Sequence, residues 1–159
     1  MIQRVMKDQL RRGLVAGLAL SASPASAGQC PADKMADNVR ITGEMTPKQV
    51  TDTVLGTIEL GREKVALADR RLRLRRLVVQ PGGVVPWHSH EDRPALIHVV
   101  SGTILEHASN CSVPIEHKAG DTSVEKLGVQ HWWKNNGKLP AVLLSADLFR
   151  DKHDDEEMM

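Results

Sequence analysis

The 159-residue sequence is poor in aromatic side chains, with no Tyr, one Phe and three Trp. All three Trp flank histidines: Trp87 precedes His88, and Trp132 and Trp133 follow His131. Two interpretations stay open, because these rings either line a pocket beside the histidines or fill the core of the domain. The chain length fits one domain with a real core and is too short for two.

The sequence also lacks an excess of charge of one sign, with 21 Lys and Arg against 20 Asp and Glu. The first 27 residues hold four of the basic residues and one of the acidic ones, so the remainder is slightly acidic. This balance gives no reason to expect nucleic acid or a membrane surface as a partner. We therefore expect a small-molecule ligand or substrate.

No apolar run is long enough to cross a membrane, since the run at residues 13–22 is far short of a bilayer span. A basic start precedes it, and the small-residue pattern Ala25-Ser26-Ala27 follows it. This order predicts an export signal over residues 1–27, a mature chain that begins at Gly28, and a periplasmic or secreted location. The pair Arg11-Arg12 leaves both the general secretory and the twin-arginine routes open.

Cysteine is scarce as well, with Cys30 and Cys111 as the two examples. An even count in an exported chain favours a disulfide, which would fasten the N-terminal arm at residues 28–48 to the domain. Two unpaired thiols are the alternative, and a metal-binding or reactive Cys111 is a more remote one.

Convincing amphipathic helices are missing, and short strand-like segments separated by turn signals follow one another along the chain. They lie at residues 50–60, 69–79, 84–90, 95–100, 103–107, 113–118, 122–125, 130–134 and 141–149. Many short strands at near-regular spacing indicate an antiparallel sandwich or barrel. We place this domain at residues 49–149 and expect an acidic, flexible tail at residues 150–159.

One strand has an unusual pattern, in which Arg71, Arg73 and Arg75 alternate with Leu72 and Leu74. The period of two predicts a half-buried strand with its arginines on the solvent face. A nucleic-acid patch is a weaker interpretation. A subunit interface, and with it a homodimer, is a further possibility.

The stretch His88-Ser89-His90 lies in another predicted strand. Side chains two residues apart in a strand point to the same face, so the two imidazoles would project side by side. Neutral imidazole is the commonest transition-metal ligand, and this pair forms half of a metal site.

Two motifs in this sequence resemble those of the cupin superfamily. The first is a glycine, five residues, His-x-His and a later glycine, matched by Gly82, His88, His90 and Gly102. The second is matched by Gly120, Gly128, His131 and Asn135, with Lys126 where the family usually has Pro. The resemblance implies an all-β fold, the cupin double-stranded β-helix, a jelly-roll-like antiparallel barrel with a metal inside.

By matching positions, the resemblance implies that His88, His90 and His131 bind a divalent transition metal such as Fe, Mn, Ni, Cu or Zn. The glutamate that is the family's fourth ligand is replaced by Ala95. Three possibilities follow: a three-histidine site with open positions, a pocket without metal, or a substitute carboxylate. The candidates for that carboxylate are Glu91, Asp92, Glu106 and Glu125.

Other polar residues receive smaller roles. Glu91 and Glu125 are candidates for a general base. Trp133 shares the face of His131 and is a candidate pocket wall, and Arg93 could hold a substrate carboxylate.

The remaining polar residues singled out are expected to lie outside the site. We expect His98 to point away from it, and His107 and His117 to lie in outer strands or loops. Asn135 is interpreted as a turn former rather than a substrate contact.

The sequence thus favours an exported metal-binding cupin that acts as a metal-dependent, dioxygenase-like oxidoreductase on a small organic molecule. A non-catalytic protein that binds a metal or a small ligand is the alternative. A metal-free isomerase or epimerase is a weaker one.

Overall fold

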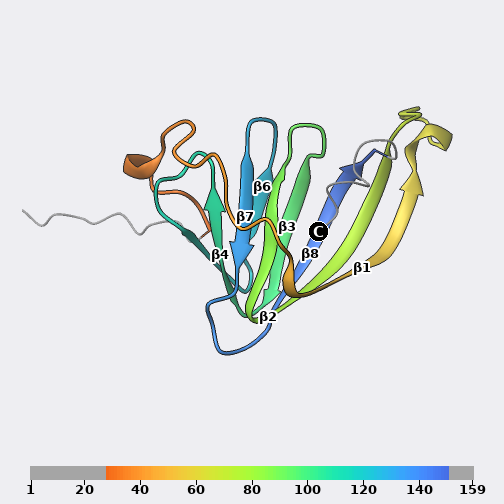
Figure 1. Ribbon diagram of the computed structural model, residues 1–159. Coiled ribbons are helices and arrows are strands. Elements are labelled where there is room, and N and C mark those ends of the chain that lie inside the picture. Colours follow the sequence, from red (N-terminus) through yellow and green to blue (C-terminus); the bar gives the residue numbers. More distant parts are fainter. Residues whose placement is uncertain (1–27, 151–159) are drawn as a thin grey trace, which may run out of the picture.

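The computed structural model describes residues 28–150, and the predicted export signal and all but the first residue of the predicted tail lie outside this range. Within this range, eight strands and two single-turn 3-10 helices follow each other (Figure 1). The strands are β1 Lys48–Glu59, β2 Arg71–Ser89, β3 Ala95–Ser101, β4 Thr103–Ala108, β5 Ile115–Lys118, β6 Thr122–Glu125, β7 Gln130–Lys134 and β8 Ala141–Phe149. The helices are η1 Ala32–Lys34 and η2 Leu60–Arg62.

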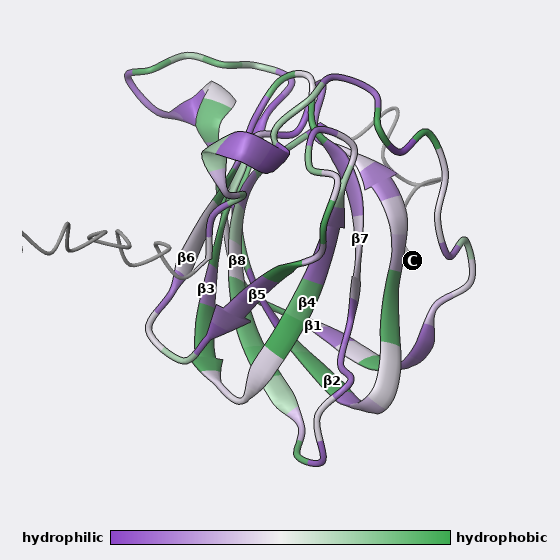
Figure 2. Cartoon of the chain, turned by 90° about the vertical axis from the view of Figure 1, so that its left-hand side faces the viewer, coloured by the Kyte–Doolittle hydropathy of each residue, from purple (hydrophilic) through white to green (hydrophobic). Residues whose placement is uncertain are grey.

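All strand pairs are antiparallel, in the order β5-β4-β7-β2-β8-β3-β6, with β1 added along the first half of β2. The sheet curls into a nearly closed barrel (Figure 2). This confirms the all-β barrel predicted from the strand pattern. In the described part of the chain, neither helix has the length and apolarity that a membrane crossing requires.

The longest strand, β2, differs from the prediction because we expected a break at Gly82-Gly83. The strand instead continues through these glycines to Ser89. Gly82 has a φ of 80°, a left-handed conformation that glycine adopts without steric cost. The strand can therefore change partners without ending, from β1 and β8 in its first half to β7 in its second.

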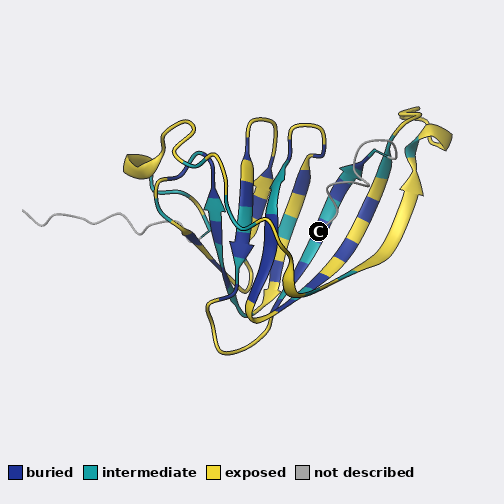
Figure 3. Cartoon of the chain, in the orientation of Figure 1, coloured by how far each residue is buried: buried dark blue, intermediate teal, exposed yellow. Residues whose placement is uncertain are grey.

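Arg73 and Arg75 of β2 face inward, so the prediction of a solvated arginine face is wrong. Arg73 and Arg75 are 5% and 9% exposed, whereas Leu72 and Leu74 are each 39% exposed. Buried and exposed bands alternate along this strand (Figure 3). Asp147 of β8 explains the reversal. Its carboxylate accepts hydrogen bonds from Arg73 at 3.1 and 2.9 Å and lies 3.3 Å from an Arg75 nitrogen. Paired charges can be buried, and alternation alone does not say which set is inside.

The inner face of the barrel is charged at one end and apolar at the other. Along the β2–β8 pair, Arg73 lies opposite Asp147 near one end of the barrel, and Leu77 lies opposite Leu143 further in. The apolar cluster at this second end consists of Leu77, Val79, Val85, Val99, Ile104, Trp133, Ala141 and Leu143. Burial of this cluster supplies the main hydrophobic stabilisation of the barrel.

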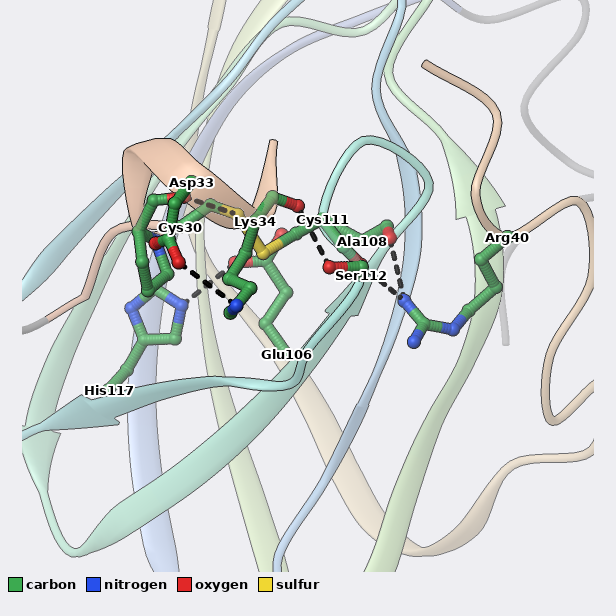
Figure 4. Close-up of a disulfide and its surroundings, with 10 residues drawn as sticks. Cys30, Asp33, Lys34, Arg40, Glu106, Ala108, Cys111, Ser112 and His117 are labelled. Carbon is green, nitrogen blue, oxygen red and sulfur yellow. Dashed lines mark hydrogen bonds and ion pairs between the residues drawn. A yellow bond between two sulfur atoms is a disulfide. The ribbon is translucent and has the colours of Figure 1, made fainter. Parts of the chain in front are cut away.

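The N-terminal arm is fastened to the barrel by a disulfide between Cys30 and Cys111, which confirms the predicted pairing (Figure 4). Met35 forms an isolated bridge with Cys111, and Arg40 donates to the carbonyl oxygens of Ala108 and Cys111 at 2.7 and 3.1 Å. The arm therefore lies against β4 and the turn after it.

Candidate metal centre

Three histidines meet inside the barrel, two from β2 and its end and one from the neighbouring β7. His88 lies directly opposite His131 in the ladder. Between Val85 and His88 the register shifts, because β2 has one more residue here than β7. This bulge at Pro86 and Trp87 lets both Val85 and His88 face the interior, which a regular strand would not allow for residues three apart.

The Nε2 atoms of the three rings form a tight triangle. His88 and His90 are 3.1 Å apart, His90 and His131 3.0 Å, and His88 and His131 3.2 Å. The Nδ1 atoms face Pro86 O at 2.8 Å, Arg93 O at 2.8 Å and a Glu106 carboxylate oxygen at 2.7 Å. These oxygens can only accept, so each Nδ1 carries a proton and donates it.

This tautomer leaves three Nε2 lone pairs close together, an arrangement that a cation or a proton between them would stabilise, although Trp133 Nε1 also donates to His131 Nε2 at 3.4 Å. Nitrogens at about 2.1 Å from a shared ion and roughly 90–100° apart lie about 3.0–3.2 Å from each other. The observed triangle has this size. The donor set therefore fits a divalent transition metal held by three neutral imidazoles.

The electrostatic environment keeps two of the rings neutral. Burial lowers the pKa of His88 well below its ordinary value, and the neighbouring His131 and His90 lower it further. Burial likewise lowers the pKa of His90, to about 3. Burial lowers the pKa of His131 too, but the carboxylates of Glu125 and Glu106 outweigh it and the net shift is upward. In the absence of a metal, His131 is therefore the ring that takes up a proton.

Glu106, on β4, supports His131 from behind and is itself shared with a second histidine. Its two oxygens accept from His131 Nδ1 at 2.7 Å and from His117 Nε2 at 2.8 Å. Burial raises the pKa of Glu106, but hydrogen bonds from His117 and His131 outweigh this and lower the pKa to about 2. A charged carboxylate behind a histidine fixes the ring's tautomer and raises the basicity of the nitrogen facing the metal.

The position of the usual fourth ligand, Ala95, lies on the inner face of β3 between two acids. It pairs with Glu125 of β6 on one side and with Asp147 of β8 on the other. Glu125 lies 3.4 Å from His131 Nδ1 and accepts a 2.5 Å hydrogen bond from Ser123. The Glu125 carboxylate therefore lies with Glu106 beside Nδ1 of His131. It is not part of the triangle of Nε2 atoms.

A pocket of about 550 Å3, part of it open to solvent, leads to the three imidazoles. Its walls combine apolar and basic residues: Arg75, Leu77, Val85, Pro86, His88, His90, Arg93, Ile97, His131, Trp133, Leu143 and Ser145. Trp133 and Arg93, the two pocket candidates from the sequence, both border it. The lining contains no carboxylate among the described residues, so neither Glu91, which is exposed, nor Glu125 borders the pocket.

The hydrogen bonds that link His117 and Glu106 to His131 were not predicted from the sequence. Glu106 was considered only as a substitute ligand. His117 was expected in an outer strand or loop, but it is fully buried in β5 and 4.6 Å from the Trp133 ring. Its Ile-Glu-His-Lys strand alternates buried and exposed residues, a signal that could have placed it inside. His98 is exposed and His107 stacks on Trp132, both away from the triangle.

The fold and the site together define a class, a small antiparallel β-barrel with an imidazole cluster in its interior. Residues 75–147 match the family model described as "Cupin domain". The chain therefore carries a cupin domain, as the two motifs in its sequence indicated.

Curated relatives of this chain include plant proteins. Nectarin-1 from Nicotiana plumbaginifolia is 33% identical over 76 residues, which cover 46% of this chain and 33% of the relative. Auxin-binding protein ABP19b from Prunus persica is 36% identical over 74 residues, covering 45% and 35%. Germin-like protein subfamily 2 member 2 from Arabidopsis thaliana is 31% identical over 103 residues, covering 61% and 47%. The chain spans a third to a half of the length of these relatives.

Solved structures agree on the fold. The polyketide cyclase RemF from Streptomyces resistomycificus superimposes with a TM-score of 0.53 at 24% identity, covering 74% of this chain and 76% of that one. TT1209 from Thermus thermophilus gives a TM-score of 0.51 at 16% identity, covering 69% and 91%. Likeness at this level of identity concerns the barrel alone.

Proposed function

We propose that this chain is an exported cupin that binds a divalent transition metal through His88, His90 and His131. We propose further that it acts as a metal-dependent, dioxygenase-like oxidoreductase on a small organic anion. The observation that carries the proposal is the triangle of three Nε2 atoms, 3.0–3.2 Å apart, at the end of a pocket. The Cys30–Cys111 disulfide supports an oxidising compartment, where such bonds persist.

The charge of the site supports an anionic ligand. Three neutral imidazoles leave the charge of a divalent ion uncompensated, and Ala95 supplies no carboxylate in its usual place. Arg75 and Arg93 both border the pocket. The Nε atom of Arg75 is buried and meets no acceptor among the described residues, so a ligand oxygen has a donor to bind.

The other walls limit the ligand to a small molecule with an apolar body. Leu77, Ile97 and Leu143 form one wall, and Trp133 lies on the side of the metal ligands. A divalent transition metal bound here would supply a Lewis acid or, where redox active, a one-electron centre. The protein's part is to hold the ion, to orient the anion with its arginines and to exclude water with the apolar wall.

A second function, that of a non-catalytic metal or small-ligand binder, is favoured by one observation. None of the described residues bordering the pocket is a carboxylate, so no acidic side chain there can take a proton from a substrate. A binder needs no such group.

Metal content and oxygen uptake test the proposal in sequence. The protein is purified without added metal, and its bound metals are identified by mass spectrometry and compared with those of His131→Ala. His98→Ala is the matched control, since His98 is exposed on the opposite face of a strand. We expect stoichiometric metal in the wild type and in the control and a loss of metal in His131→Ala. Equal metal content in all three proteins would refute a three-histidine site.

The loaded protein is then screened for oxygen consumption with catechols, flavonols and small diketones. Turnover of any of these supports the oxidoreductase. Ligand binding without turnover in the metal-loaded protein supports the non-catalytic role instead.

A further inference from the structure

His117 has one nitrogen that the hydrogen bonds to the metal site do not use. Its Nε2 donates to Glu106, so the ring carries its proton there and Nδ1 is an acceptor. This Nδ1 is buried and has no partner among the described residues. A buried acceptor without a donor is unfavourable, so a donor is expected nearby.

Gly28 lies next to this nitrogen. The position that a Cβ atom on Gly28 would occupy is 3.1 Å from His117 Nδ1 and 3.5 Å from the carboxyl carbon of Asp121. The backbone nitrogen of Gly28 donates to Glu116 O at 3.1 Å. Cys30, two residues further on, holds this end of the arm against the barrel through the disulfide, close to Glu106 and His117 (Figure 4).

Gly28 is also the residue at which the sequence predicts that the mature chain begins, after the pattern Ala25-Ser26-Ala27. While residue 27 is attached, the nitrogen of Gly28 has a single hydrogen, and Glu116 O receives it. Once residue 27 is removed, the nitrogen becomes an ammonium with three hydrogens. Rotation about the Cα–C bond of Gly28 can then move the nitrogen to the position described above for a Cβ atom, 3.1 Å from His117 Nδ1. This position is free for the nitrogen because glycine has only a hydrogen there.

We propose that leader cleavage between Ala27 and Gly28 creates a docking contact, in which the new α-ammonium group binds the buried His117 Nδ1 and the half-buried Asp121 carboxylate. The site is one of proteolytic modification, and its ligand is the chain's own amino terminus. It rests on the proposed export of the protein and not on the identity of the metal.

This contact completes a continuous line of polar groups from the amino terminus to the metal site. The ammonium donates to His117, His117 donates to Glu106, and Glu106 accepts from the candidate ligand His131. Removal of the leader therefore fixes the orientation of His117 and, through Glu106, supports the ring at the metal.

The test compares two forms of the protein, both with the disulfide intact. One begins at Gly28, and the other retains one residue and begins at Ala27. Each is exposed to an amine-reactive reagent at neutral pH, and labelling of the α-amine is followed by mass spectrometry against the same protein unfolded and reduced. We expect at least about fivefold protection for the Gly28 form and none for the Ala27 form, because a buried, hydrogen-bonded amine is withheld from the reagent. Thermal unfolding should give a higher Tm for the Gly28 form.

Asp121→Asn in both forms is the matched control. Asp121 lies beside Gly28. The substitution leaves in place the hydrogen bonds that Glu106 accepts from His117 and His131. It should reduce the protection of the Gly28 form and leave the Ala27 form unchanged. Equal labelling of the native and unfolded Gly28 forms, or equal Tm values for the two forms, would overturn the proposal. So would a mature exported protein whose first residue is not Gly28.

Metal content is measured on the same samples, which separates this proposal from the proposed function. A protected amine in a protein that binds no metal leaves the docking contact standing and refutes the metal site. An unprotected amine in a metal-loaded protein does the reverse.

Discussion

The replacement Glu106→Gln tests whether the buried carboxylate sets the tautomer of His131. Glu106 accepts from two N–H donors, one on His131 and one on His117. Glutamine offers one oxygen and one NH2 group, so only one of these donors keeps an acceptor. If the NH2 group faces His131, Nδ1 must give up its proton to accept, and Nε2 then carries a proton in place of a lone pair.

The expected losses follow from this change. One charge-assisted hydrogen bond disappears, which costs about 1.5–3 kcal/mol of stability. Loss of a carboxylate behind a metal-bound histidine typically weakens metal binding about 10–100-fold, equivalent to about 1.4–2.7 kcal/mol. We therefore expect a folded but less stable protein whose affinity for Zn²⁺ or Co²⁺ falls by at least about tenfold.

The assay is a competition titration with a chromophoric chelator, combined with thermal unfolding of the metal-free protein. Glu125→Gln is the matched control. The nearest Glu125 oxygen lies 3.4 Å from His131 Nδ1, compared with 2.7 Å for Glu106, and the amide replacement can still accept from Ser123. We expect metal affinity in this variant to stay close to that of the wild type.

Two results would refute the reasoning. One is a folded Glu106→Gln protein that binds metal as tightly as the wild type, because the tautomer would then not depend on the carboxylate. The other is an equal loss in both variants, which would show that any change of charge behind His131 has the same effect.

Three further predictions concern pH, the disulfide and the buried ion pairs. Because the pKa of His131 is raised, a proton competes with the metal for Nε2, and below that pKa metal affinity measured by titration should fall about tenfold per pH unit as the solution is acidified. Replacement of Cys30 and Cys111 by Ser opens a loop with a sequence separation of 81 and should cost about 4.5 kcal/mol in denaturant unfolding; an unchanged midpoint would contradict this. Asp147→Asn leaves Arg73 without its buried carboxylate and should lower stability by about 3–5 kcal/mol in the same assay, whereas a loss near zero would mean that the charge is compensated elsewhere.

Much of the barrel could be predicted from the sequence because strand length, turn residues and period-two alternation are local properties. The predicted segment 122–125 coincides with β6 and segment 130–134 with β7. Alternation does not say which of its two faces is inside, and this is why the arginines of β2 were placed in solvent. Cross-strand carboxylates reverse that choice: Asp147, 74 residues further along, for Arg73, and Asp52 together with Asp147 for Arg75.

The candidate site could be predicted in part for a similar reason. His88, His90 and His131 are marked by spacing within two motifs, and the structure brings them together. Glu106 and His117 carry no such spacing, and their role depends on how β4 and β5 pair with β7 and with each other. The alternation of β5 could place His117 inside, but its contacts arise from the three-dimensional register of the sheet and not from local spacing.

The bulge at Pro86 and Trp87 decides how this site can be lost or kept when the chain length changes. If β2 relaxed to a regular ladder at its present length, Trp87 would take the inward face and His88 and His90 would both turn outward. Deletion of Pro86 or Trp87 would instead remove the extra residue and leave both imidazoles inside. A one-residue deletion is therefore tolerable here, whereas a one-residue insertion or deletion between His88 and His90 would separate the three rings without altering any of them.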